Sequence, residues 1–325
     1  MSNLVSYIAL VLAVGIPLII TAIGGLFAER SGVTNIALEG LMIIGAFVGI
    51  LFMNNVSAKS VGGPFVLFLI TSLIVALIGV LFSMIHAVAS IKMNADQIIS
   101  ATAINTLTPA LALFLTMSLS LGAAAGSDKL PVHGDIFKIS EVPVLSKIPI
   151  LGDIFFKNIN ASFYMGIIIL VVSIVFLYKT RFGLRLRACG ENPHAADAAG
   201  INIQRVRFIA VGISGALAAL GGFYLVTAYT TEFSASVSGY GFLAVAVLIF
   251  GNWKPVRVAI SAIFFAALLT LSRGIAFFPA LESLNIDKNI LSMIPYIATL
   301  IVLVISSKNN RAPKAVGKVY DKGER

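Results

Sequence analysis

Charge is scarce in this sequence. Only 11% of the 325 residues are Asp, Glu, Lys or Arg, whereas 58% are hydrophobic. Soluble globular domains carry about 25% charged residues, so this composition excludes an ordinary soluble protein and indicates an integral membrane protein. Cys189 is the only cysteine, which excludes an internal disulfide. A Gly-x-x-x-x-Gly-Lys-Ser/Thr phosphate loop is also lacking, so we expect any ATP hydrolysis to be supplied by another chain.

Long apolar stretches are abundant instead. About 20 apolar residues cross the hydrocarbon core of a bilayer. The first stretch has no charge before Glu29 and lacks the basic start of a signal peptide, so we expect a retained spanning helix. We predict that residues 1–325 form a single all-α transmembrane domain with about nine spans, at residues 5–28, 36–53, 64–89, 98–120, 161–178, 206–229, 239–252, 256–272 and 290–306.

Two of these nine segments are weak spans. Residues 36–53 follow Asn35 and contain Glu39 close to their start, and residues 239–252 are only fourteen in number. Either segment could be a broken or re-entrant helix, which a membrane tolerates only where protein or water covers the backbone. The count therefore ranges from eight to ten spans.

The basic residues predict the orientation. With the N-terminus outside and the C-terminus in the cytoplasm, sixteen of the 23 Lys and Arg residues fall on the cytoplasmic side, as the positive-inside rule requires. This topology makes residues 121–160 an extracellular loop, residues 179–205 a cytoplasmic loop and residues 307–325 a basic cytoplasmic tail. The net charge of +9 is then a topology signal with some attraction to anionic membrane lipid, and no nucleic-acid partner is needed to explain it.

A short capped helix is predicted within the cytoplasmic loop. In the stretch GENPHAADAAGIN, Asn192 suits the N-cap, Pro193 suits the first helical position and Gly200 suits the left-handed position after the last turn. The intervening side chains are mostly small, so this helix has little apolar surface of its own to bury. We expect it to dock against a cytoplasmic partner, whereas the arginines before it could simply lie at lipid headgroups.

Two long blocks resemble one family. The stretches FGLRLRACGENPHAADAAGINIQRVRFIAVGISGALAALGGFYL (182–225) and GGLFAERSGVTNIALEGLMIIGAF (24–47) resemble ABC-transporter permeases of the simple-sugar, branched-chain amino-acid and nucleoside branch. LSKIPILGDIFFK (145–157) and IFGNWKP (249–255) are similar to the smaller of two permeases in Gram-positive nucleoside importers. The resemblance implies a bacterial multi-pass membrane permease, of broadly vitamin-B12-importer topology, that takes nucleosides; simple sugars such as ribose or branched-chain amino acids remain alternatives.

The resemblance also implies partners. In such importers the short cytoplasmic helix is a coupling helix that seats on an ATPase subunit, which holds the ATP and Mg²⁺; this chain itself needs no cofactor and is not an enzyme. An external substrate-binding lipoprotein and a second permease are implied too, with a heterodimer favoured over a homodimer. Matching the motif places seven residues at the ATPase interface: Gly190, Glu191, Asn192, Pro193, Ala195, Ala196 and Gly200.

Polar residues within the spans are candidates for the translocation path. Asn35 and Glu39 are four residues apart and so share a helix face, and ionisable groups at membrane depth usually face the bundle interior or an aqueous path. Glu39 therefore either borders the path or forms a hydrogen-bonded knot that holds a broken helix. Asn105 and Thr106 are further candidates for a cavity wall.

Two rival classes of membrane protein are weaker. Gly212, Ser214 and Gly215 match an intramembrane serine protease pattern, but no histidine falls within a later span to act as its base. An ion-coupled secondary transporter would show internal repeats and several intramembrane carboxylates, and only Glu39 is a candidate.

Overall fold

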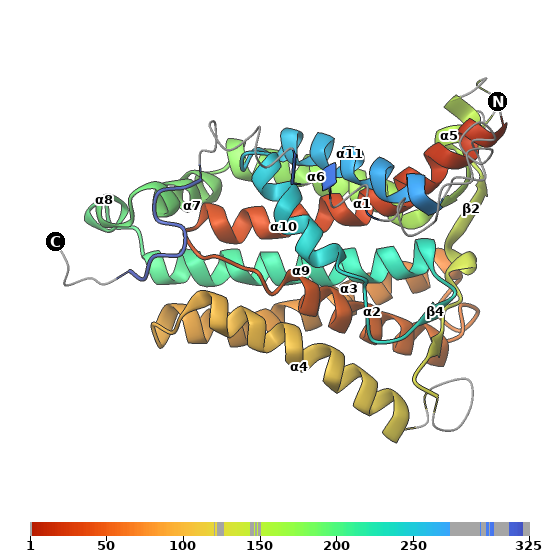
Figure 1. Ribbon diagram of the computed structural model, residues 1–325, viewed down its shortest axis with the longest axis horizontal. Coiled ribbons are helices and arrows are strands. Elements are labelled where there is room, and N and C mark those ends of the chain that lie inside the picture. Colours follow the sequence, from red (N-terminus) through yellow and green to blue (C-terminus); the bar gives the residue numbers. More distant parts are fainter. Residues whose placement is uncertain are drawn as a thin grey trace.

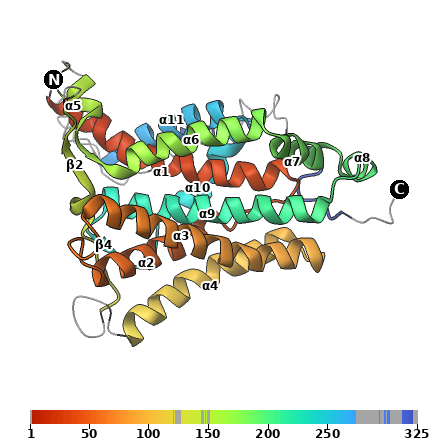
Figure 2. The same cartoon turned by 180° about the vertical axis from the view of Figure 1, so that it is seen from behind.

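The structure is an elongated helical bundle. It is a computed structural model that describes residues 2–119, 127–143, 151–273 and 312–320, together with isolated residues 121, 146, 148, 293, 297, 298, 300 and 301. Most of the helices run along the long axis of the bundle, and the start of the chain and segment 312–320 lie at opposite ends of it (Figures 1 and 2).

Within the described part of the chain, six helices are long and apolar enough to cross a membrane. They coincide with the first six predicted spans, which agrees with a polytopic membrane protein. A short π-helical turn, η1 (Val88–Lys92), extends the third of them. The six are α1 (Ser2–Arg30), α2 (Leu38–Asn55), α3 (Pro64–Ala87), α4 (Gln97–Ser118), α6 (Ala161–Lys179) and α9 (Ile203–Tyr229).

Of the last three predicted spans, one is too short to cross a bilayer, one forms a helix, and one lies mostly outside the described residues. The seventh becomes α10 (Tyr240–Phe250), whose 11 residues extend only about 16 Å and cannot cross a bilayer alone. The eighth becomes α11 (Pro255–Arg273). The ninth, residues 290–306, lies outside the described residues apart from five isolated positions.

The predicted cytoplasmic loop is more helical than expected. Residues 181–191, which we took for the basic start of a loop, form α7 (Arg181–Glu191), and the capped helix follows as α8 (Pro193–Ala198). Thr180 begins α7, because its hydroxyl accepts a hydrogen bond of 3.0 Å from the amide of Gly183. Both helices project from one end of the bundle (Figure 1).

Helix α9 is the centre of the bundle, with α1, α2 and α3 packed around it. Glycines permit the close approach of these helices. A Cβ atom on Gly222 would collide with the backbone carbonyl of Met42 in α2, and one on Gly45 would collide with the backbone of Ala219 in α9. Gly45 and Gly49 thus form one packing face of α2 toward α9, since Gly49 in turn lies against the ring of Phe223.

The opposite end of the bundle carries the short strands. Two antiparallel pairs form there, one of which joins residues 130–131 to residues 232–233. That pair ties the predicted extracellular loop to the segment after α9, and the other pair lies within the loop. The elements are β1 (Leu130–Pro131), η2 (Gly134–Phe137), β2 (Lys138–Glu141), α5 (Leu151–Phe155), β3 (Lys157–Asn160) and β4 (Glu232–Phe233).

Candidate functional site

Helix α8 has the caps that its sequence predicts. The side-chain oxygen of Asn192 accepts a hydrogen bond of 3.0 Å from the amide of Ala195, and Pro193 occupies the first helical position. Gly200 lies in the left-handed region with a φ of 79°. Its amide donates to the carbonyl of Asp197, and the next amide, of Ile201, donates to the carbonyl of Ala196. This pair of bonds is a Schellman motif, which closes a helix with a fixed exit direction.

The seven predicted coupling residues divide into an exposed and a buried group. Glu191, Asn192, Ala195 and Gly200 are exposed and Pro193 is half-buried. Ala196 is only 4% exposed and packs into the main core, so it holds α8 against the bundle and is not part of its outer face. The small exposed side chains of α8 leave room for a partner's close approach.

Gly190 is the second buried member of the group. A Cβ atom there would collide with the carbonyl of Arg30, at the end of α1. The guanidinium of Arg30 in turn donates two hydrogen bonds, of 3.0 and 2.8 Å, to the carbonyl of Trp253, and the Trp253 indole donates to the carboxylate of Glu29. The α7–α8 junction is therefore fixed to α1 and to the turn between α10 and α11. Sequence reasoning missed this anchor, because two of its contacts are to backbone carbonyls.

A second polar cluster lies inside the bundle at the start of α2. Residues 31–37 are not helical, so α2 begins only at Leu38. The carboxylate of Glu39 accepts hydrogen bonds from the amides of Gly239, at 2.9 Å, and Gly241, at 2.6 Å. These amides stand at the N-terminus of α10, where free N–H groups and the helix dipole favour a negative charge. The two segments that the sequence marks as weak spans thus meet at one buried carboxylate.

Two asparagines complete this polar junction, which comprises Asn35, Glu39 and Asn105. Asn105 in α4 accepts from the amide of Gly40, at 2.8 Å, and donates to the carbonyl of Ile36, at 3.0 Å. Asn35 donates to the hydroxyl of Ser214 in α9, at 2.9 Å. Side chains of the two asparagines thus pair backbone groups at the non-helical start of α2, those of Ile36, Ala37 and Gly40.

Thr106 lies apart from the polar junction. It is exposed on α4, and its hydroxyl donates to carbonyls of its own helix, those of Thr102 and Ala103. The structure therefore brings together three of the four predicted path residues. The fourth stands on the outer face of α4, where another chain or an aqueous cavity could meet it.

The described histidines give the protease alternative no support. Ser214 pairs with Asn35, whereas His86 contacts the hydroxyl of Ser100, at 2.7 Å, and the carbonyl of Thr34, at 3.0 Å. Gly215, next to Ser214, is a packing residue that lies against Ser83 and Gly79 of α3. Among the residues that the structure describes, no cluster of His, Cys, Asp or Glu could hold a metal ion.

The comparisons with known proteins identify the family. The model of the family described as "Branched-chain amino acid transport system / permease component" matches residues 7–304. The chain belongs to this family. It is therefore a permease subunit of an ABC transporter, a transport component and not an enzyme, and a multi-pass protein of the bacterial cell membrane that works with an ATPase and a substrate-binding partner.

Two individual relatives match nearly the whole chain, and a third matches about half of it. The guanosine ABC transporter permease protein NupQ of Bacillus subtilis is 42% identical over 95% of this chain and 94% of its own length. The nucleoside ABC transporter permease protein NupC of Lactococcus lactis is 39% identical over the same shares. A second Lactococcus permease, NupB, is 28% identical over 52% of this chain and 47% of its own length. No solved structure matches.

Proposed function

We propose that this chain is the smaller permease of an ATP-driven nucleoside importer. The observation that carries the substrate class is the similarity, over 94–95% of both chains, to permeases named for guanosine and for nucleosides. The ATP-driven mechanism is supported by α8, a capped helix at one end of the bundle whose exposed residues include the small Ala195 and Ala198.

In the proposed topology the N-terminus is outside and the C-terminus is cytoplasmic, with nine spans of which two are broken. The end that carries α7, α8 and residues 312–320 is rich in Arg and Lys, which supports a cytoplasmic position for it. The strands at the other end then face outward with the 121–160 loop, where a binding lipoprotein would deliver substrate.

The proposed coupling route begins at α8. When the ATPase dimer closes on ATP, the exposed residues Glu191, Asn192, Ala195 and Gly200 would transmit its movement. The buried Gly190 and Ala196 would carry that movement into α1 and the core, because backbone packing there leaves little room for independent motion. A capped helix suits this role better than a flexible loop, since it moves as one body.

The polar junction would be the part of the path that rearranges. Hydrogen bonds of the polar junction connect four helices: α2, α4, α9 and α10. A movement of these helices relative to one another would therefore break these bonds and allow others to form. Thr106, on the outer face of α4, would line the cavity shared with the second permease. We favour a heterodimer, because Lactococcus lactis has two unlike nucleoside permeases, NupC and NupB, that are both similar to this chain.

Uptake of radiolabelled uridine tests the function. We expect uptake to be lost when the gene is deleted in its native host and restored by the wild-type gene. Unlabelled adenosine and guanosine should compete, whereas ribose and leucine should not. Retained uridine uptake, with loss of ribose or leucine uptake instead, would reject nucleosides and leave the chain as a permease for another substrate of this family.

A further inference from the structure

The described part of the C-terminal tail is folded onto the junction between α7 and α8. The amide of Ala315 donates a hydrogen bond of 2.9 Å to the carbonyl of Gly190, and the amide of Gly317 donates one of 3.3 Å to the carbonyl of Gly32. Ala315 is only 4% exposed. Segment 312–320 is therefore held against the same junction that positions the proposed coupling helix.

A buried arginine connects this segment to α9. The guanidinium of Arg207, which is 3% exposed, donates to the carbonyl of Ser31, at 3.2 Å, and to the carbonyl of Lys318, at 3.3 Å. One side chain thus bridges the turn after α1 and the tail from the first turns of α9. Carbonyl groups receive donors from Nε and Nη1, whereas Nη2 has no hydrogen-bond partner among the described residues. The two bonds that do form hold the tail and the turn after α1 to α9.

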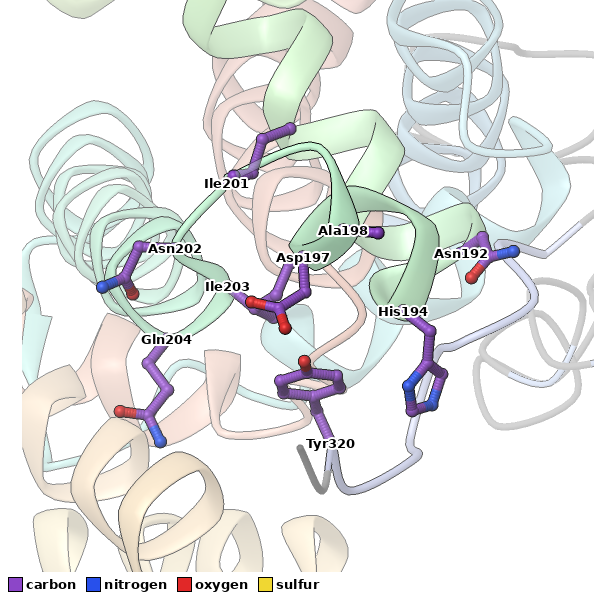
Figure 3. A pocket seen from close by; sticks show the side chains of 10 residues that line it. Asn192, His194, Asp197, Ala198, Ile201, Asn202, Ile203, Gln204 and Tyr320 are labelled. Carbon is purple, nitrogen blue, oxygen red and sulfur yellow. The ribbon is translucent and has the colours of Figure 1, made fainter. Parts of the chain in front are cut away.

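The described segment 312–320 brings an aromatic side chain beside α8. The ring of Tyr320 lies 5.3 Å from the ring of His194, measured between centroids. Both residues line an open hollow of about 1290 Å³, together with polar groups that include Asp197 and Gln204 (Figure 3). In Figure 3 these side chains reach the hollow from three directions: α8, the start of α9 and the tail.

We infer that segment 312–320 and α8 form one composite docking surface for the ATPase subunit, with Tyr320 as a contact residue. This inference rests on the proposed coupling role of α8. The six residues of α8 extend only about 9 Å, whereas a stable interface needs roughly 800 Å² from each partner. The hollow is continuous with the exposed residues of α8, so an ATPase seated on α8 also meets Tyr320.

The chemistry of the hollow fits a protein partner. Its wall combines an aromatic ring with amide, imidazole and carboxylate groups, as in interfaces where a tyrosine supplies contact area and polar neighbours supply hydrogen bonds. Tyrosine is among the side chains whose truncation most weakens protein–protein binding. Because hydrogen bonds at Ala315, Gly317 and Lys318 hold the tail backbone, it presents this ring at little entropic cost.

Copurification of the complete importer tests the inference. The ATPase subunit is pulled down with the tagged permease from membranes that contain both permeases, in the variants Tyr320→Ala, Tyr320→Phe and Val319→Ala. We expect Tyr320→Ala to weaken ATPase binding roughly tenfold, in the range of a lost interface anchor. Tyr320→Phe keeps the ring and should bind normally, as should Val319→Ala, which truncates an exposed neighbour outside the hollow.

Two further measurements separate the possible failures. The variant Ala195→Trp places bulk on the exposed face of α8 and should abolish ATPase binding. If Ala195→Trp binds normally, the proposed coupling role of α8 fails; if it loses binding while Tyr320→Ala keeps it, only the tail inference fails.

The second measurement uses Cys189, which is fully buried beside Gly190 and reports on packing at the junction. Protection of Cys189 from a maleimide should persist in Tyr320→Ala. Exposure of Cys189 in that variant would mean that the tail is a structural strap, and would overturn its role as a contact surface.

Discussion

The carboxylate of Glu39 accepts a hydrogen bond of 2.6 Å from the backbone amide of Gly241, two hundred residues further along the chain. This bond joins α2, which begins late, to α10, which is too short to cross the membrane. Each broken segment leaves backbone groups that no lipid can satisfy. The two broken segments satisfy each other, because the free amides at the start of α10 donate to the one acidic side chain of α2.

Replacing Glu39 by Gln tests whether this contact is structural. The carboxylate receives both amide donors, whereas a glutamine turns an NH₂ group toward one of them. We expect Glu39→Gln to lower the free energy of unfolding by about 1–3 kcal/mol and to reduce uptake in parallel. Thermal unfolding of the purified protein in detergent measures the first effect, and nucleoside uptake measures the second.

Glu232→Gln is the control for this substitution. Glu232 is an exposed carboxylate at the other end of the bundle, where it pairs with Lys129 at 2.8 Å. Exposed pairs contribute little to stability, so this variant should resemble the wild type. A Glu39→Gln protein with unchanged thermal unfolding but no uptake would contradict the structural role and return Glu39 to the translocation path.

Two buried glycines of α9 form a matched pair for the packing argument. A Cβ atom at Gly222 would collide with the backbone of Met42, which cannot move without shifting α2. At Gly212 a Cβ atom would meet the terminal methyl of Met84, at 3.2 Å, which a flexible side chain can withdraw, and the side chain of Val80 at an ordinary 3.7 Å. We expect Gly222→Ala to destabilise the protein by about 1–3 kcal/mol and Gly212→Ala to be nearly neutral. Equal thermal unfolding of the two variants would refute the close approach of α2 and α9.

Local signals in the sequence predicted local features well. The caps of α8 depend on Asn192, Pro193 and Gly200 alone, and each stands where these residue types are favoured. The weak spans were recognisable from the polar residue Glu39 and from the shortness of residues 239–252. Their mutual contact was not, because the amides that Glu39 meets carry no sequence signal.

Features that depend on distant backbone contacts escaped prediction. Helix α7 is amphipathic and basic, so a search for apolar spans reads it as a loop. The tail reaches Gly190 and Gly32 through its own amides, which any residue except proline would provide. The burial of Ala196 follows from the way α8 lies on the core, and an alanine-rich helix of six residues gives no periodicity that distinguishes its faces.

Substitutions at the N-cap of α8 test whether transport depends on the stability of this helix. Asn192→Ala removes the acceptor for the amide of Ala195 and should cost about 1 kcal/mol of local helix stability. Because α8 has only six residues, we expect it to fray and uptake to fall several-fold, while the amount of protein in the membrane stays constant. Asn192→Asp keeps an acceptor at the same place and should retain uptake. Full uptake in Asn192→Ala would show that coupling does not require a rigid α8.

Cys189 provides a chemical measure of the packing that supports this helix. The thiol is buried, and burial raises its pKa to about 11, so at pH 7.5 it is almost entirely protonated. The thiolate is the nucleophile, so a raised pKa lowers reactivity at neutral pH. We expect the native permease to resist a polar maleimide at pH 7.5 and to react at once after denaturation in detergent.

The pH dependence of this labelling has a definite sign. Since the pKa in the folded protein is raised, any native labelling rate should keep rising about tenfold per pH unit above pH 9, where an unperturbed thiol would level off. Ala199→Cys in a Cys189→Ser background is the control, because residue 199 is exposed at the end of α8 and should label rapidly. Rapid labelling of native Cys189 at pH 7.5 would mean that the α7–α8 junction opens, and that α8 is less firmly joined to α1 than its contacts indicate.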